Sequence, residues 1–359
     1  MAAPSIPPAP IMPPVLSKKA VPIKTSLLLM MLTTAIFFLT SKRLQDILTI
    51  ADSKLLIDPI TMTEFAARHI PTIATGLYIQ EFSQFDMLTG TLAFNGSVWF
   101  RFDPELIGLD LVSKFSFESA NITYKSPPIT QLAEDGSLFA RFDVQVAFKN
   151  NMNYRFFPFD DHRINLVIVN KYISIHDAFL ITQDDDETII CDMESQGWRL
   201  QAMRTVFGYR QENFDSEDRT KSNLYPAAGY EFDYEHNDSR SSLVLFLPML
   251  ILFFLACVPF SISADSDYSG ARLGLTSASL TGLVSFRFAI DNFSPHVGYF
   301  MISDYLFLLF IVLCFICFIT SVFDEVLHRI SSLTILVGTH LLVIGTLLVL
   351  VVIEQLWVN

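Results

Sequence analysis

Three long apolar runs constrain this chain's fold more than any other feature. They cover residues 243–262, 297–323 and 332–353. Each is close to, or longer than, the roughly 20 residues that a helix needs to cross a bilayer core of about 30 Å. A buried core helix would explain one such run. Three of them close together, in a chain that is 51% hydrophobic, predict an integral membrane protein.

A further apolar segment lies near the N-terminus. Residues 1–23 are rich in Pro and Ala and are expected to form a disordered leader. Residues 24–43 are predicted to be a transmembrane anchor or a signal segment. Phe38–Ser41 does not resemble a small-x-small cleavage site, which favours an uncleaved anchor. Under either interpretation the domain that follows is translocated to the far side of the membrane.

Residues 44–240 are predicted to form an all-β extracytoplasmic sandwich. Apolar side chains alternate with period two in 94–102, 142–148 and 164–168, as in half-buried strands. Turn signals punctuate the region at Asn95-Gly96, Asp135-Gly136 and Gln196-Gly197. No long helical pattern intervenes, so an antiparallel sandwich is the expected class.

Charge and motifs exclude several functions. A net charge of −13 argues against nucleic acid as a partner. The acidic run 184–187 indicates a solvated loop or, alternatively, a patch sensing protons or divalent cations. Cys191 is the only cysteine before residue 257, so the soluble part cannot hold an internal disulfide, and Cys314 and Cys317 favour helix packing. No nucleophile–base motif, metal cluster or phosphate loop occurs in the soluble part, so we expect no enzyme, no cofactor and no metal.

The segment 271–292 carries a stripe on one side of a predicted helix. At about 100° per residue its small and polar side chains share one narrow sector, with leucines on the flanks and back. Close helix packing is one explanation. Because the stripe persists along the whole span, we expect it to line an aqueous pore. The predicted pore-lining residues are Gly274, Ala278, Thr281, Ser285, Phe288 and Asn292.

Arg287 points away from this stripe at the same periodicity, toward the predicted bundle. A charge there requires a partner. Asp291 and Asp304 are the candidates.

Several motifs in collinear order resemble pentameric ligand-gated ion channels, particularly the bacterial members that lack the disulfide. Phe157-Pro158-Phe159-Asp160 resembles the family's signature loop, and no cysteine occurs between 140 and 170. The resemblance covers about 70–355. Its other elements are Val98-Trp99-Phe100-Arg101, Trp198, Pro248, Gly270–Leu275 and Pro295.

The resemblance implies a four-helix transmembrane pore domain at 241–359 and assembly as a homopentamer. Its partners would be membrane lipid, permeant inorganic ions, and a small-molecule or proton agonist. The expected location is the bacterial inner (plasma) membrane, with the sandwich outside the cytoplasm. Selectivity stays open, because Asp265 and Asp267 favour cations whereas Ala271-Arg272 resembles the entrance of anion channels. A non-conducting, membrane-anchored sandwich sensor is the alternative.

The resemblance also implies two sets of site residues. An agonist at a subunit interface would contact Phe102, Phe115, Phe117, Lys171, Tyr172, Tyr225 and Tyr230. Alternatively, these aromatics fill the sandwich core, and His162, His176 and His236 suit proton gating. Coupling to the pore would use Asp86, Phe157, Pro158, Phe159, Asp160, Arg240 and Pro295, with Asp160 and Arg240 acting as one unit.

Overall fold

The structure of the chain is a computed structural model of two compact units. It describes residues 20–45, 55, 57–60, 70–182, 194–195, 197–213, 222–236, 239–262, 268–323 and 331–358. One unit is helical and comprises Met1–Ser41, Leu243–Asn292 and Asp304–Ile353. The other is built of strands and comprises Lys42–Ser242, Phe293–Ser303 and Glu354–Asn359. Several sequence predictions fall outside the described residues: most of the leader, the acidic run 184–187, Cys191, Asp265 and Asp267.

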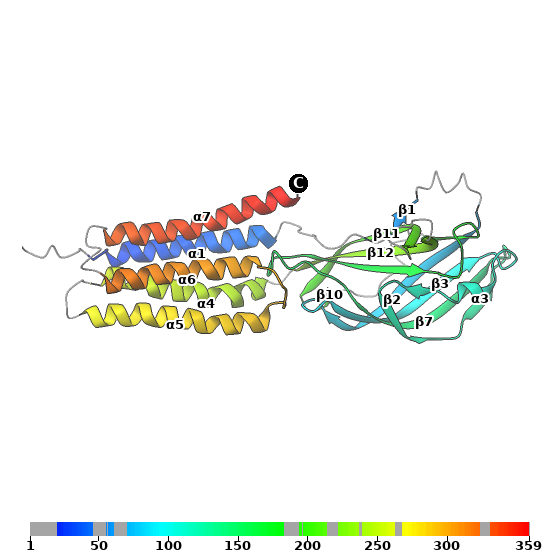
Figure 1. Cartoon of the computed structure of the whole chain (residues 1–359), viewed down its shortest axis with the longest axis horizontal. Helices are drawn as coiled ribbons and strands as arrows, with labels where there is room; N and C mark the ends of the chain where they lie inside the picture. The colour runs from blue at the N-terminus through cyan, green and yellow to red at the C-terminus, as the bar shows by residue number, and fades with distance from the viewer. Residues whose placement is uncertain are drawn as a thin grey trace, which may run out of the picture. The chain divides into compact units, whose positions relative to one another are not determined.

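The strand unit contains two six-stranded sheets (Figure 1). The β12 sheet has the order β1 (Asp58–Pro59), β11 (Trp198–Asn213), β12 (Ser222–His236), β8 (His162–Val169) and β4 (Ser116–Phe117), with β10 (Glu194–Ser195) paired to β11. The β3 sheet has the order β5 (Ala120–Lys125), β7 (Leu138–Lys149), β3 (Thr91–Phe102), β2 (Thr72–Asp86) and β9 (Phe179–Thr182), with β6 (Ile129–Leu132) paired to β7. Only β2 and β9 pair in parallel among the described strands.

One hydrophobic core joins the inner faces of the two sheets. Val98 and Phe142 from the β3 sheet belong to the same buried cluster as Ile164 and Phe232 from the β12 sheet. Burial alternates strictly along β3 up to Phe100, as the period-two pattern predicts. The predicted strands at 94–102, 142–148 and 164–168 are confirmed, and the arrangement is sandwich-like.

The turn predicted at Asn95-Gly96 is wrong, because both residues lie inside β3. β2 has a bulge between Ile79 and Glu81, opposite Gly96. A Cβ atom at Gly96 would lie 2.2 Å from the carbonyl oxygen of Tyr78, so only glycine fits this close backbone approach. The turn that joins β2 to β3 ends instead at Gly90, whose φ is +66°.

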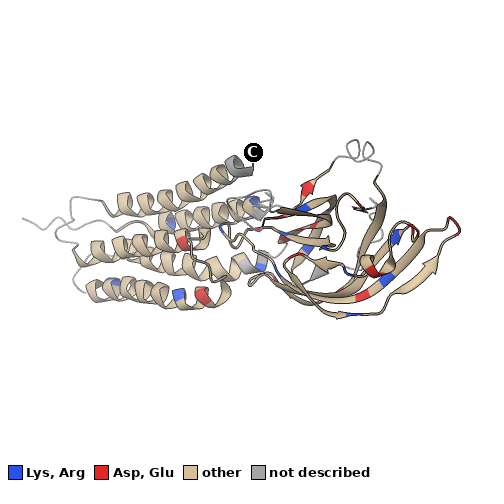
Figure 2. Ribbon diagram, turned by 45° about the vertical axis from the view of Figure 1, so that its right-hand side comes forward, with Lys and Arg blue, Asp and Glu red and all other residues tan. Residues whose placement is uncertain are grey.

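Within the described residues, the helical unit contains five helices that are long and apolar enough to cross a membrane (Figure 1). They are α1 (Ile23–Gln45), α4 (Ser239–Cys257) with its 3₁₀ extension (Val258–Ser261), α5 (Ser269–Phe293), α6 (Ile302–Val322) and α7 (Ser332–Val358). The short helix α3 (Leu109–Val112) lies in the strand unit. Lys, Arg, Asp and Glu residues are sparse along the ribbon of the long helices and more frequent along the strands (Figure 2). These features are those of a membrane protein.

The N-terminal helix α1 packs against α4. The rings of Phe37 and Phe246 are 5.5 Å apart, and the Val21 N–H donates to the Phe260 carbonyl at 3.0 Å. Ser26 and Thr33 are buried on α1. The helix covers the segment 24–43, which the sequence predicts to be a transmembrane anchor or a signal segment. It packs against the rest of the helical unit.

Candidate functional site

Helix α5 has a buried face made of mixed residue types. Its buried residues recur at helical spacing: Arg272, Thr276, Ser279, Leu283 and Ile290. The hydroxyl of Ser279 donates to the Leu275 carbonyl at 2.9 Å, and that of Thr276 donates to the Leu273 carbonyl at 3.1 Å. These buried hydroxyls are thus satisfied within the helix itself.

The opposite face of α5 is exposed and carries every residue predicted to line a pore. At about 100° per residue its centre lies about 170° from that of the buried face. Phe288 is the large apolar residue on it, with 71% of its surface exposed. We call this face the α5 stripe; it comprises Gly274, Ala278, Thr281, Ser285, Phe288 and Asn292, all exposed in the single chain.

Arg287 joins α5 to α6 on the inner side, as the sequence predicts. Its guanidinium lies 2.6 Å from Oδ1 of Asp304, which is buried, and 3.1 Å from Oδ1 of Asp291. The guanidinium also lies 5.4 Å from the ring centroid of Phe307. Both predicted partners are confirmed, and the pair ties the two helices together.

Four of the seven residues predicted to bind an agonist lie in the sandwich core. Phe102, Phe115, Phe117 and Tyr230 are at most 4% exposed. Phe115 packs edge-on against Phe142 with ring centroids 5.3 Å apart. These four assignments are corrected to core residues, because no ligand reaches side chains so deeply buried.

Tyr230 illustrates the correction. Its hydroxyl donates to the Thr75 carbonyl at 3.2 Å, across the core from β12 to β2. Burial raises the pKa of Tyr230 well above its usual value, so the phenol stays neutral.

The other three predicted residues are exposed or half-buried, and each takes part in a contact with a lysine ammonium. Lys171 Nζ lies 3.2 Å from both carboxylate oxygens of Glu212 and 5.8 Å from the ring centroid of Tyr225. Tyr172 is 65% exposed, and Lys114 Nζ lies 5.1 Å from its ring centroid. This cluster has the exposed aromatic and charged groups of a small-ligand contact.

Residues 154–157, which lead into the signature loop, contact the link between α5 and α6 and the first turn of α6 within the strand unit. The N–H of Tyr154 donates to the Tyr299 hydroxyl at 2.9 Å. The Arg155 carbonyl accepts from the Ile302 N–H at 3.0 Å, and the Phe157 carbonyl accepts from the Ser303 N–H at 3.3 Å.

The predicted coupling residues take several positions around this contact. Phe157, Pro158 and Phe159 are buried, and so is Pro295 in the link. Asp86 has a local role, because its carboxylate accepts from the Leu88 N–H at 3.0 Å and stabilises the β2–β3 turn.

Asp160 has a different neighbour from the one expected. Its Oδ2 lies 3.4 Å from Nε2 of His162, and both side chains are buried, whereas Arg240 is exposed. The His162 ring lies in a row between Tyr154 and Trp198, with centroid distances of 5.0 and 5.3 Å. The buried neighbour of Asp160 in this loop is therefore His162, and the two form an ion pair only when the imidazole is protonated.

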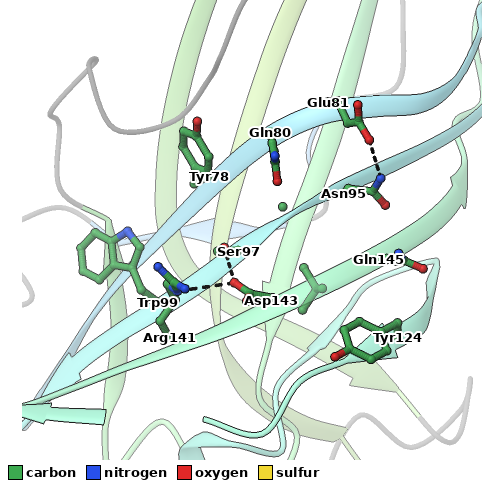
Figure 3. A pocket seen from close by; sticks show the side chains of 12 residues that line it. Tyr78, Gln80, Glu81, Asn95, Ser97, Trp99, Tyr124, Arg141, Asp143 and Gln145 are labelled. Carbon is green, nitrogen blue, oxygen red and sulfur yellow. Dashed lines mark hydrogen bonds and ion pairs between the residues drawn. The ribbon is translucent and has the colours of Figure 1, made fainter. Parts of the chain in front are cut away.

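The outer face of the β3 sheet has a hollow that was not predicted from the sequence (Figure 3). It has a volume of about 670 Å³. Antiparallel pairing of β2, β3 and β7 arranges its walls in three cross-strand rows. The rows are Trp99 with Arg141; Tyr78 with Ser97 and Asp143; and Glu81 with Asn95, Gln145 and, from β5, Tyr124.

Internal polar contacts hold the walls of this hollow. The Asn95 amide donates to Glu81 at 2.8 Å, and the Ser97 hydroxyl donates to Asp143 at 2.7 Å (Figure 3). Arg141 Nε lies 3.4 Å from the same Asp143 carboxylate. The alternation along β3 indicates these outward positions, but only the pairing of four strands brings them together.

None of the protein-family models and none of the curated proteins compared with this chain matches it. The functional assignment therefore rests on the residues and geometry described above.

Proposed function

We propose that this protein is a pentameric ligand-gated or proton-gated ion channel with its pore lined by α5. The α5 stripe carries the proposal: a membrane-length helix buries one face in its own unit and exposes a small, polar face on the other side. Lipid tails do not solvate such a face, whereas five copies around an axis would surround water with it.

The stripe also suggests where the pore closes. Thr281, near its middle, is too small and hydrophilic to exclude water. Phe288 is the bulky apolar member of the stripe and is exposed. Five phenylalanine rings converging at this level would close the pore by dewetting, without any charge.

The signature loop offers a route from the sandwich to this gate. The segment 154–157 at its start bonds to Tyr299 in the link that follows α5, and to Ile302 and Ser303 in the first turn of α6. A movement of the loop would therefore displace the link, which lies within a few residues of Phe288. Coupling of this kind requires two arrangements of the contact, each favoured by one ligation state.

Two stimuli fit the described groups. A small molecule at a subunit interface would contact Lys171, Tyr172 and Tyr225, while protons would act at His162 beside Asp160. The sandwich would face outside the cytoplasm in a bacterial inner membrane, and inorganic ions would permeate.

Cysteine accessibility tests the pore. Ala278→Cys, Thr281→Cys and Ser285→Cys, each in a Cys191→Ser background that removes the cysteine of the soluble part, are labelled in lipid vesicles with a charged, membrane-impermeant thiol reagent. The control is Val312→Cys on α6, a position 54% exposed but apolar in its surroundings. Only a thiol in water ionises and reacts fast, so the three α5 positions should label and block current while Val312→Cys stays unreactive.

Equal labelling of the α5 and α6 cysteines would refute the pore. Labelling without current in a planar bilayer, over a pH series and a panel of amines and amino acids, would favour the non-conducting sensor. Native mass spectrometry of the purified protein should give a pentamer.

A further inference from the structure

We propose that the hollow on the outer face of the β3 sheet is a binding site for a neutral, polyhydroxylated ligand such as a disaccharide. The site lies on the opposite sheet from the Lys171 cluster. The inference does not depend on ion conduction.

The charges of the hollow disfavour an ion. An anion is disfavoured because the two carboxylates, Glu81 and Asp143, outnumber the guanidinium of Arg141. For a cation, Asp143 is already paired with Arg141 at 3.4 Å and Glu81 already accepts a hydrogen bond at 2.8 Å. Each carboxylate already accepts a hydrogen bond from a neighbouring wall residue. A neutral ligand avoids both repulsion and the cost of breaking these contacts.

Lys125, which pairs with Val144 at the edge of the hollow, does not add a charge to it. Its Nζ lies 3.6 Å from the ring centroid of Phe115 and donates to the backbone carbonyls of Ser113 and Phe115. Burial lowers its pKa to about 8. The amine is thus directed toward the core.

The remaining polar groups suit hydroxyls. Among the described hydrogen bonds, none uses the side chains of Tyr78, Gln80, Tyr124 or Gln145. Phenols and carboxamides both donate and accept, and a sugar hydroxyl does the same. Several such groups converging on one hollow give the directional contacts that distinguish hydroxyls from water.

Trp99 supplies the flat apolar surface that a sugar ring also needs. A Cβ atom at Gly76 would lie 2.0 Å from the indole, so the ring packs directly over the glycine backbone. Phe139 stacks against it at 5.8 Å with an interplanar angle of 28°. These contacts hold the indole in place and cover part of it, and the surface that they leave open on the partly buried ring offers an apolar contact to the C–H face of a pyranose.

The three rows set the length of the ligand that fits the hollow. Successive rows on β3 are two residues apart, or about 7 Å, so the three rows extend over about 14 Å. An elongated molecule of more than one ring fits this length.

Calorimetric titration of the full chain tests the site. Nanodiscs replace alkyl maltosides, because those detergents carry a disaccharide headgroup. The probes are maltose, cellobiose, lactose and trehalose, with choline and glycine as charged comparators. Gln145→Ala and Tyr124→Ala remove wall groups, and Gln131→Ala is the matched control on β6, exposed but outside the hollow.

At least one disaccharide should bind, and each wall variant should weaken it about tenfold while Gln131→Ala leaves it unchanged. The affinity should not fall as salt rises, because the ligand is neutral. Circular dichroism confirms that each variant is folded. Binding of choline or glycine alone, binding of no probe, or an equal effect of Gln131→Ala would each overturn the proposal. None of these outcomes affects the channel proposal, which is tested by labelling and current.

Discussion

Helices α5 and α6 follow one another in the chain and are both long and apolar enough to span a membrane, yet their exposed faces differ. On α6 the exposed side chains are large and apolar, among them Leu308, Val312 and Phe315. On α5 the exposed surface includes the stripe, whose members other than Phe288 are small or polar, with Leu273, Val284 and Phe293 exposed beside it. Length and apolar content therefore place both helices in a membrane, while the residue types on the exposed face indicate what each helix faces. For α6 this is lipid, and for α5 it is water in our proposal.

The largest expected effect is that of a single substitution on the α5 stripe. Phe288→Ser replaces the bulky apolar member of the stripe with a small hydroxyl, so water should enter the closed pore. Channels in planar bilayers should then conduct without stimulus.

Phe315→Ser on α6 is the matched control, since Phe315 is also exposed at 51%. It should leave the resting current at zero, as should Thr281→Ser on the stripe. If Phe288→Ser channels stay closed at rest and open normally on stimulation, the gate lies elsewhere.

The next effect concerns the ion pair that joins the two helices. Arg287→Ala removes the guanidinium that lies 2.6 Å from the buried carboxylate of Asp304, which should lower the free energy of unfolding by about 3 kcal/mol. Unfolding in mixed micelles measures the change. Asp291 is half-exposed, so Asp291→Ala should cost only about 0.5 kcal/mol. Equal losses would show that Asp304 does not depend on Arg287.

The smallest expected effect concerns the loop that holds the link between α5 and α6. In a double-mutant cycle, Asp160→Asn and His162→Gln should show a coupling energy of about 1 kcal/mol in the unfolding free energy. The matched cycle of Asp160→Asn with Arg240→Gln should be additive within about 0.5 kcal/mol. Coupling to Arg240 instead would restore the pairing expected from the sequence.

Periodic features were predictable from the sequence. The apolar runs, the strands at 94–102 and 164–168 and the α5 stripe all follow from repeats of 2 or about 3.6 residues. The partners of Arg287 were also predictable, because one lies four residues away on the same helix and the other near the start of the next apolar run.

The direction of individual aromatic side chains was not predictable in the same way. β4 has only two residues, too few for a period, so the burial of Phe117 could not be inferred. β12 is buried on both faces, because Leu55 and Ile57 lie against Gly229 on the outer side while Tyr230 faces the core. Without alternation, the inner residues of β12 do not stand out. The hollow depends on the register of four strands, which no single segment encodes.

The first turn of α6 has a consequence for the order in which the chain folds. The N–H groups at the start of a helix have no partner within it. Those of Ile302 and Ser303 are satisfied by loop carbonyls far earlier in the sequence, and the nearby bond between Tyr154 and Tyr299 joins residues 145 positions apart. Contacts of such long sequence separation carry a large loop-closure entropy and form late. Synthesis from the N-terminus therefore presents the loop carbonyls long before the N–H groups that they accept from, and the contact forms at the cost of closing the whole intervening chain.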